Sequence, residues 1–326
     1  MIPLRKSAAK LLQCDFNDVC VGSSATEILS SLAWAIAPKE GTNVVSTQAS
    51  FPSTVYPWTR VSQEFNSEIR LAPHDNSFYT KPEDILNLID SQTSVVTLSH
   101  VEYANGQRYD LELFSQAAHD VGALLIIDAT QSLGAMPINA YDSGADAIVS
   151  SGYKWLRGSF GAAVAYISPN IYSSLIPGLL GFRSHNEMWD MRADRFELPN
   201  SASRFEFSTI NFGSALGLSA SIDEILDYGI DNVWKHNLEL INIIVSRCKE
   251  MNLHIASSLS DSERSAIISL EPPSGQHAAV IVNRLQDDYG ILVTNRSGLI
   301  RVSPHMDNSR ADIIFLMNSL EEILSS

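Results

Sequence analysis

The sequence is poor in three features that mark other classes of protein: long apolar runs, cysteine and net positive charge. No apolar run approaches the roughly 18 residues of a membrane-spanning helix, and the opening MIPLRKSAAK lacks the apolar core of a signal peptide. We therefore expect a cytoplasmic protein with no membrane partner. The cysteines Cys14, Cys20 and Cys248 form no C-x-x-C pair, so we expect free thiols and no metal site.

The charge balance argues against a nucleic-acid partner. The chain has 22 lysines and arginines against 37 aspartates and glutamates, a net charge of −15, and no basic stripe stands out. A site for an anionic ligand must then be built locally, from backbone amides, hydroxyls and a few arginines.

The first half of the chain alternates strand-like and helix-like patterns. The strand-like runs are residues 42–47, 94–100, 122–129, 145–151 and 162–168, and the helix-like segments are residues 25–37, 81–90 and 110–122. Strands rich in Val, Ile and Leu that alternate with helices predict an α/β fold, with a mostly parallel sheet covered by helices on both faces.

The C-terminal part has a different pattern. A helix-rich stretch, 214–250, is followed by strand signals at 264–271, 290–294 and 299–304 and by a final helix over 310–325. This pattern predicts a smaller α+β domain. We place the boundary near residue 225, which gives a large domain 1–225 and a small C-terminal domain 226–326.

Polar residues follow several of the predicted strands, where ligands of parallel sheets bind. Ser23 and Ser24 stand at a helix start, where hydroxyls and free amides suit a phosphate, although plain N-capping explains either serine. Asp128 closes a strongly apolar strand, where a buried carboxylate needs a positive partner or caps the next helix. Lys154, in VSSGYKWLRGSFGAAV (149–164), follows the next strand among small residues. The three segments are expected to converge at one edge of the sheet.

In order, Gly22-Ser23-Ser24, Asp128-x-x-Gln131 and Ser151-Gly-Tyr-Lys154 resemble the class V aminotransferases and cysteine desulfurases, which are pyridoxal 5'-phosphate (PLP) enzymes of fold type I. The resemblance continues in the segments 49–58, 204–218 and 300–313, so it covers nearly the whole chain. It implies a large PLP-binding domain with a seven-stranded, mostly parallel sheet.

The resemblance also implies a role for each matching residue. Lys154 forms a Schiff base with PLP and then moves the substrate's α-proton, while Asp128 pairs with the pyridinium nitrogen. Gln131 binds the ring's 3-oxygen. The remaining cofactor contacts are Ser23, Ser24, Ser151 and Tyr153 at the phosphate, Phe51 on the ring face and Tyr103 near the 3-oxygen.

Two further residues concern the substrate and the partner. Arg301 matches the arginine that holds the substrate's α-carboxylate, a task suited to a guanidinium, although an ordinary salt bridge is the alternative. Thr209 matches a threonine that reaches the cofactor phosphate of the neighbouring subunit. The resemblance therefore implies a homodimer with shared active sites.

The sequence departs from the family pattern in several places. Desulfurases carry a nucleophilic cysteine shortly before the position of Arg301, and residues 293–301 (VTNRSGLIR) contain none. Phe51 replaces a stacking histidine, and Tyr103 stands where an asparagine is common. We expect the N-terminal arm that helps to close the site in this family to be short or missing. A persulfide mechanism is disfavoured, because it needs a thiol that reaches the substrate.

The leading hypothesis is a PLP enzyme that acts on an α-amino acid, with an aminotransferase as the nearest named activity. A C–S lyase, β-eliminase or epimerase of the same family is the alternative, because the cofactor residues do not separate these reactions. A non-catalytic relic is disfavoured, since Lys154, Asp128 and Gln131 are all present. A nicotinamide site is weaker still, because GSSATE (22–27) lacks the G-x-G-x-x-G spacing.

Overall fold

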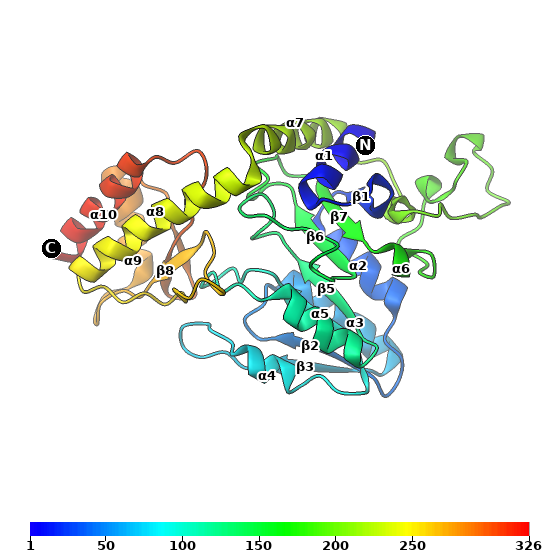
Figure 1. The fold of residues 1–326 in the computed structure, drawn as a ribbon, viewed down its shortest axis with the longest axis horizontal. Helices are drawn as coiled ribbons and strands as arrows, with labels where there is room; N and C mark the ends of the chain where they lie inside the picture. The colour runs from blue at the N-terminus through cyan, green and yellow to red at the C-terminus, as the bar shows by residue number, and fades with distance from the viewer. Residues whose placement is uncertain (326) are drawn as a thin grey trace.

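The computed structural model describes residues 1–325, and its centre is a seven-stranded sheet (Figure 1). The strands follow one another across the sheet in the order β1-β7-β6-β5-β4-β2-β3. Their bounds are β1 Val19–Gly22, β2 Asn43–Thr47, β3 Glu68–Ala72, β4 Thr93–Ser99, β5 Leu124–Asp128, β6 Ala147–Ser151 and β7 Ala163–Ile167. Only β7 runs antiparallel to its neighbours, β1 and β6. The predicted α/β fold with a mostly parallel seven-stranded sheet is confirmed.

Parallel pairing brings the predicted polar strand ends together. β4, β5 and β6 pair in parallel, with Ser99 opposite Asp128 at the end of the first pair. The last residue of β6 is Ser151, so Lys154 follows three residues beyond the same edge. Residues from three separate segments therefore meet at the carboxyl ends of the strands.

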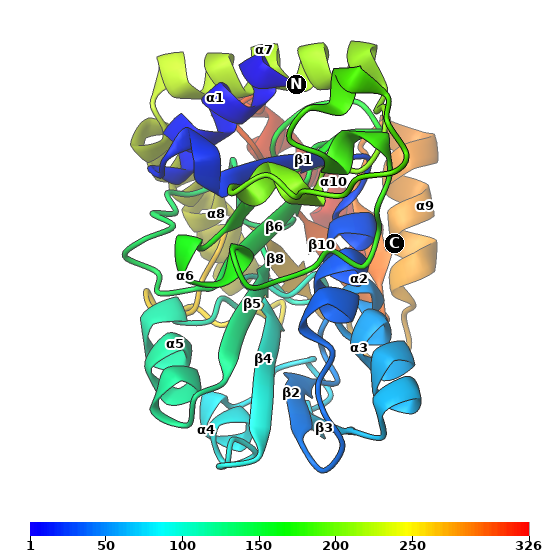
Figure 2. The same cartoon turned by 90° about the vertical axis from the view of Figure 1, so that its right-hand side faces the viewer.

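Helices cover both faces of the sheet (Figure 2). One face packs against α1 (Ile2–Leu12), α5 (Leu111–Asp120) and α7 (Phe212–Tyr228), and the other against α2 (Ala25–Ile36) and α3 (Pro52–Phe65). Short helices α4 (Pro82–Leu86) and α6 (Pro169–Tyr172) lie in the connections. None of the helices within residues 1–325 is long and apolar enough to cross a membrane.

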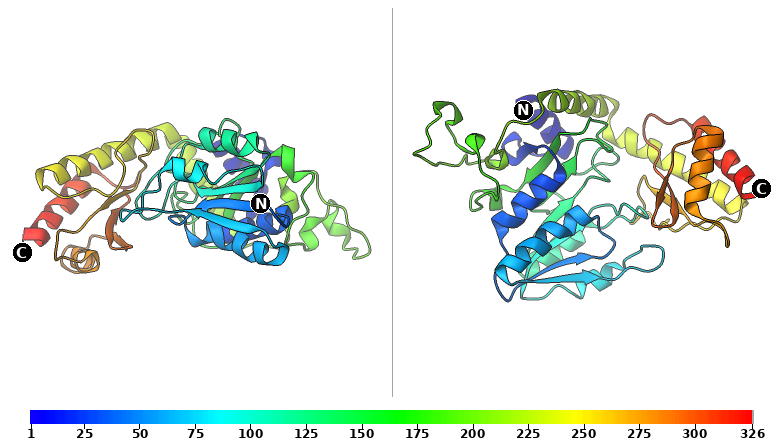
Figure 3. Two further views of the ribbon diagram at one scale, coloured as in Figure 1. Left: turned by 90° about the horizontal axis from the view of Figure 1, so that it is seen from below. Right: turned by 180° about the vertical axis from the view of Figure 1, so that it is seen from behind.

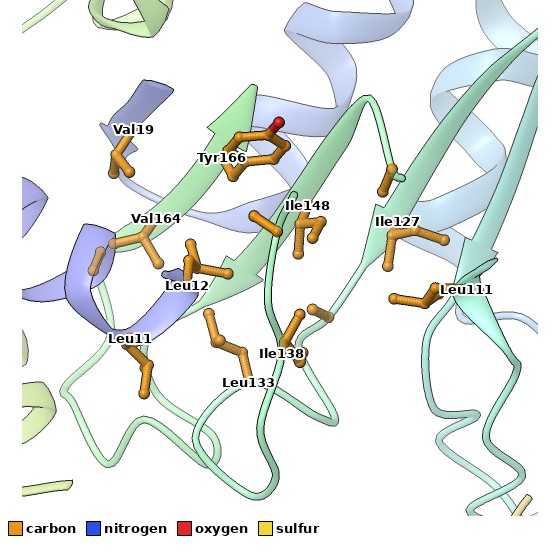
Figure 4. Close-up of a cluster of buried hydrophobic side chains, with 14 of the residues drawn as sticks. Leu11, Leu12, Val19, Leu111, Ile127, Leu133, Ile138, Ile148, Val164 and Tyr166 are labelled. Carbon is orange, nitrogen blue, oxygen red and sulfur yellow. The ribbon is translucent and has the colours of Figure 1, made fainter. Parts of the chain in front are cut away.

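The two apolar layers follow from the alternation of side chains along each strand. In β5, Leu125 and Ile127 belong to the cluster beneath α1, α5 and α7, whereas Ile126 belongs to the cluster beneath α2 and α3. Figure 4 shows part of the first cluster, in which Ile127, Ile148 and Val164 from neighbouring strands meet side chains of α1 and nearby loops. Because both faces are buried, the strands read as continuous apolar runs.

The C-terminal part has its own sheet and its own apolar cluster (Figures 1 and 3). The antiparallel order is β8-β10-β9, with β8 Ile268–Leu270, β9 Thr294–Arg296 and β10 Leu299–Val302. It packs with α8 (Ile230–Glu250), α9 (Ala278–Tyr289) and α10 (Arg310–Ser325). All buried members of this cluster fall between Leu240 and Ile323. The domain boundary near residue 225 stays a prediction.

Several predicted elements are shorter in the structure. The strand expected over 264–271 covers only 268–270, and the helix expected over 81–90 ends at Leu86. The strand expected over 290–294 is wrong except at Thr294, because Gly290 ends α9 in the left-handed region and Ile291 and Val293 pack onto the C-terminal cluster. No element was predicted for α1, α3, β3 or α9.

The loop after β4 joins the two parts of the molecule. Gly106 has a φ of +75°, and a Cβ at this position would lie 2.4 Å from the Ile267 carbonyl oxygen. Nearby, the Arg108 amide donates to the Glu263 carbonyl at 2.7 Å, and the Ser269 hydroxyl donates to the Ala104 carbonyl at 2.6 Å. Only glycine permits this backbone approach, which seats the small sheet beside the carboxyl edge of the large one.

Candidate active site

A cavity of about 310 Å³ opens at the carboxyl ends of β4, β5 and β6, within the range of small-molecule sites. It gathers most of the predicted site residues from the large sheet and the C-terminal part. Those that line it are Phe51, Tyr103, Asp128, Gln131, Ser151, Tyr153, Lys154 and Arg301. The predicted residues Ser23, Ser24 and Thr209 are not part of its lining.

Asp128 presents a buried carboxyl group to the cavity. Its side chain accepts hydrogen bonds from the Thr130 amide at 2.9 Å and from the Thr54 hydroxyl at 3.2 Å. Burial raises the pKa of Asp128, and these hydrogen bonds oppose the rise. Among residues 1–325, no lysine, arginine or histidine forms an ion pair with it. The carboxyl group is therefore held in place by neutral donors, with no positive partner.

Lys154 lines the same cavity. Burial lowers the pKa of its ammonium group, and the positive charges of Arg301 and Arg296 lower it further. Its nitrogen lies 5.4 Å from the centre of the Tyr153 ring. A lowered pKa raises the fraction of free amine at neutral pH, which is the form that attacks a carbonyl carbon and accepts a proton.

Gln131 lies in the turn that follows β5. Its Oε1 accepts a hydrogen bond from the Trp155 indole nitrogen at 3.0 Å. This contact orients the side chain, so its NH₂ group is the part available to donate to a ligand oxygen.

Arg301 is buried, with 8% of its surface exposed, and no acidic side chain of residues 1–325 pairs with it. Its Nη1 donates to the Tyr103 carbonyl at 2.7 Å, while its buried Nε has no hydrogen-bond partner. Burial and the charge of Arg296 lower the pKa of Arg301 to about 10. The ordinary salt bridge weighed from the sequence is absent within the described chain, and a buried guanidinium of this kind calls for an anionic ligand.

Phe51 and Tyr103 form an aromatic wall of the cavity. Their rings pack edge to face, with centroids 5.5 Å apart. The Tyr153 ring packs on the Phe160 ring in a tilted arrangement, with centroids 4.5 Å apart and an angle of 32° between the ring planes. Tyr103 thus contributes both a ring to the wall and a carbonyl oxygen to Arg301.

The two predicted phosphate serines at the start of α2 are engaged locally. The Ser24 hydroxyl accepts from the Glu27 amide at 3.2 Å, which is N-capping, and the Ser23 hydroxyl donates to the Glu27 carboxylate. The sequence carried a signal for this arrangement, because S-A-T-E (24–27) fits the capping-box pattern. The expected phosphate role of both serines stays a prediction.

Other hydroxyls lie at this end of the cavity. Thr26 and Ser53, which were not predicted, line it and hydrogen-bond to each other at 2.9 Å. The Ser151 hydroxyl accepts from the Ala25 amide at 3.2 Å and keeps its own hydrogen for a ligand. The exposed Thr209 lies outside the cavity of its own chain.

Sequence reasoning also missed charged residues at the site. Arg296 lines the cavity beside Arg301, and no pattern in the sequence marked it. Glu102 is fully buried behind the aromatic wall, where it accepts a hydrogen bond from Ser50 at 3.0 Å. Burial, together with the nearby Asp128 charge, raises the pKa of Glu102 to about 8. A sequence cannot show that a loop glutamate is buried.

Comparison with known proteins identifies the family. A model of the aminotransferase class-V family matches residues 1–315. The chain belongs to this family. The predicted resemblance is confirmed, as are the expected PLP cofactor and the class of PLP-dependent transferase or lyase.

Individual relatives of the chain carry different names. It is 25% identical to a probable cysteine desulfurase of Methanothermobacter thermautotrophicus, over 98% of this chain and 82% of the relative. It is 26% identical to a kynureninase of Pseudomonas fluorescens, over 71% and 56% of the two chains. The apo structure of a cysteine desulfurase from Thermococcus onnurineus superposes with a TM-score of 0.89 at 24% identity, covering 99% of this chain and 83% of that one.

The residues of the cavity fit PLP. A buried carboxyl group without a cation suits a protonated ring nitrogen, and a buried guanidinium without an anion suits a carboxylate. The lysine amine with a lowered pKa lines the same cavity. None of these three groups has an oppositely charged partner within the described chain. The cofactor and an amino-acid substrate together would supply such partners.

Proposed function

We propose that this protein is an aminotransferase that acts on a free α-amino acid, with Lys154 as its catalytic base. The observation that carries the proposal is a set of three groups in one cavity that have no oppositely charged partner within residues 1–325: the carboxyl of Asp128, the amine of Lys154 and the guanidinium of Arg301. When bound, PLP supplies an electron sink for the negative charge that develops at the substrate's α-carbon.

Each residue has a task that follows from its contacts. Asp128 would hold a proton on the ring nitrogen, because its carboxylate is fixed by Thr54 and Thr130 and has no other cation. Gln131 would donate its NH₂ group to the ring's 3-oxygen. The edge-to-face pair of Phe51 and Tyr103 would pack against the ring and exclude water.

Arg301 would bind the substrate's α-carboxylate through its free Nε and remaining hydrogens. With the carboxylate held there, the α-proton would face the Nζ of Lys154. The lowered pKa of Lys154 suits an amine that takes this proton and returns it elsewhere, which is the proton movement that transamination requires.

We propose that the phosphate is held by Ser151, Thr26 and Tyr153, with Ser23 and Ser24 nearby at the start of α2. Thr209 is exposed and does not line the cavity of its own chain, so we propose that it serves this phosphate in a second copy of the chain. A homodimer with shared sites therefore remains part of the proposal.

A carbon–sulfur lyase is the second candidate, because several relatives are named cysteine desulfurases. A persulfide on this chain's own cysteine is not favoured. No cysteine lines the cavity, and burial raises the pKa of Cys14 to about 12 and that of Cys248 to about 11. A thiol with such a pKa is a weak nucleophile at neutral pH.

Borohydride reduction of the PLP-loaded protein, followed by peptide mass spectrometry, tests the central residue. We expect the cofactor adduct on Lys154 and none on Lys235, a lysine of α8 outside the cavity. An adduct on another lysine would contradict the assignment. Product analysis then separates the two candidates: transamination needs an added keto acid as acceptor, whereas elimination releases ammonia without one.

A further inference from the structure

Arg296 shares one face of a hairpin with Arg301. In the β9–β10 pair, Thr294 lies opposite Arg301 and Arg296 lies opposite Leu299. Side chains two residues apart on a strand point the same way, so Arg296 and Arg301 are diagonal neighbours on that face. Both line the cavity.

The positive charges of the two guanidinium groups repel each other, and no acidic side chain within residues 1–325 neutralises them. The charge of Arg296 lowers the pKa of both Arg301 and Lys154. Within residues 1–325 neither arginine has an acidic group within 4.0 Å, whereas Arg157 and Arg247 each pair with two carboxylates. In a chain with 37 acidic residues and 22 basic ones, two neighbouring arginines without an acid point to anions that arrive with a ligand.

The cofactor phosphate does not account for Arg296. The hydroxyls that suit the phosphate come from α2, α3 and β6, on the side of the large sheet. Arg296 comes from the same hairpin as Arg301, which faces the substrate in the proposed function. A substrate with only its α-carboxylate would satisfy one of the two arginines and leave the other unmatched.

We propose that Arg296 binds a second anionic group, carried on the substrate's side chain. The substrate is then an acidic α-amino acid, with a carboxylate or sulfinate on its β- or γ-carbon. This inference rests on the proposed function, since Arg301 must hold the α-carboxylate. Charge-assisted hydrogen bonds from a guanidinium to such a group are strong enough to select it over a neutral amide.

The test is a set of binding titrations on the PLP-loaded protein, in which the absorbance of the cofactor reports the binding of the ligand. The ligands are matched pairs, L-aspartate against L-asparagine and L-glutamate against L-glutamine. In the unmodified protein, at least one acid should bind about 10- to 100-fold more tightly than its amide. Arg296→Gln should remove that preference and leave the affinity for the amide within about threefold.

Two further variants serve as controls. Arg301→Gln should weaken the acid and the amide alike, because both carry the α-carboxylate. Arg60→Gln, on the exposed face of α3 where Arg60 pairs with Glu64, should change neither. PLP affinity, measured by titration of each apo-protein, should be unchanged in Arg296→Gln.

The outcomes separate the inference from the function on which it rests. Equal binding of acid and amide by the unmodified protein, or equal losses for both in Arg296→Gln, would overturn the inference and leave the proposed function standing. Loss of PLP from Arg296→Gln would assign the residue to the cofactor and also overturn it. If no α-amino acid, acidic or neutral, changes the absorbance, the proposed function itself fails.

Discussion

The two walls of the cavity differ in how their charges are satisfied. On the sheet wall, Asp128 is held by Thr54 and Thr130, and Gln131 is held by Trp155. On the hairpin wall, Arg296 and Arg301 have no acidic partner within residues 1–325. The sheet wall is thus organised before any ligand binds, which suits a resident cofactor. The positive charge of the hairpin wall is neutralised only when an anionic ligand binds, which suits a substrate that binds and is released in each catalytic cycle.

The charges of the hairpin wall also act on the pKa of Lys154. Burial is the main cause of the lowered pKa of its amine, and the positive charges of Arg301 and Arg296 lower this pKa further. An anionic substrate that neutralises Arg301 would weaken that second contribution. The basicity of Lys154 would then rise when the substrate binds, at the point where the amine must accept a proton.

The largest expected effect is on the sheet wall. Asp128→Asn removes the negative charge that would face the ring nitrogen, and it sets an amide NH₂ against existing donors. Loss of one partner of a buried charge pair costs about 3–5 kcal/mol, so PLP affinity should fall by about 100-fold or more. Titration of the apo-protein with PLP measures this.

Asp146→Asn is the matched control. Asp146 is another buried carboxyl group, hydrogen-bonded to the Leu125 amide at 2.8 Å and to His119, outside the cavity. Its replacement should reduce stability while PLP affinity is retained. Similar PLP affinity in Asp128→Asn and the unmodified protein would show that the sheet wall does not hold the cofactor as proposed.

The second effect concerns the support behind the aromatic wall. The folded protein keeps a proton on Glu102 up to about pH 8, whereas the unfolded chain loses it near 4.5. The unfolded state therefore binds fewer protons in this window, and the free energy of unfolding falls as the pH rises through it, by up to roughly 3–5 kcal/mol.

Glu102→Gln should remove this dependence. The variant keeps an acceptor for the Ser50 hydroxyl, so the segment that carries Phe51 stays in place. Thermal unfolding at several pH values measures the effect, and the variant should gain stability relative to the unmodified protein as the pH rises from 5 to 8. Parallel curves for the two proteins would show that Glu102 is already ionised in the fold.

The smallest effect tests how the two walls are joined. Gly106→Ala places a Cβ 2.4 Å from the Ile267 carbonyl oxygen and should cost about 2–4 kcal/mol in denaturant unfolding. Gly275 has a similar φ of +84° with no atom within 4 Å of an added Cβ, so Gly275→Ala should cost only about 1–2 kcal/mol. Equal costs would mean that the Gly106 contact does not set the hairpin wall.

The sheet wall could be predicted from the sequence because its signals are local. An apolar run that ends in Asp128 or Ser151 places that residue at a strand end, and parallel pairing brings the strand ends together. The positions of Ser23 and Ser24 were also predictable, but the direction of their hydroxyls depends on Glu27, which binds both residues.

The hairpin wall was only half predictable. Arg301 lies in a motif, whereas the place of Arg296 depends on the β9–β10 register, which no local pattern shows. The apolar run 290–294 was the stronger strand signal, but the strand in the structure, β9, begins at Thr294, where that run ends. Thr26 and Ser53 meet across two helix starts, a contact that appears only once the sheet is assembled.

The short turn between β9 and β10, residues 297–298, carries an engineering consequence. Gly298 has a φ of +85°, which favours glycine, but an added Cβ would have no atom within 4 Å, so we expect the turn to accept insertions that keep this glycine. Because the groups proposed for the cofactor lie on the large sheet and its helices, a library of longer or recoded turns would vary substrate choice while leaving cofactor loading intact. Replacing this one turn would thus change which substrates the protein selects without rebuilding its cofactor site.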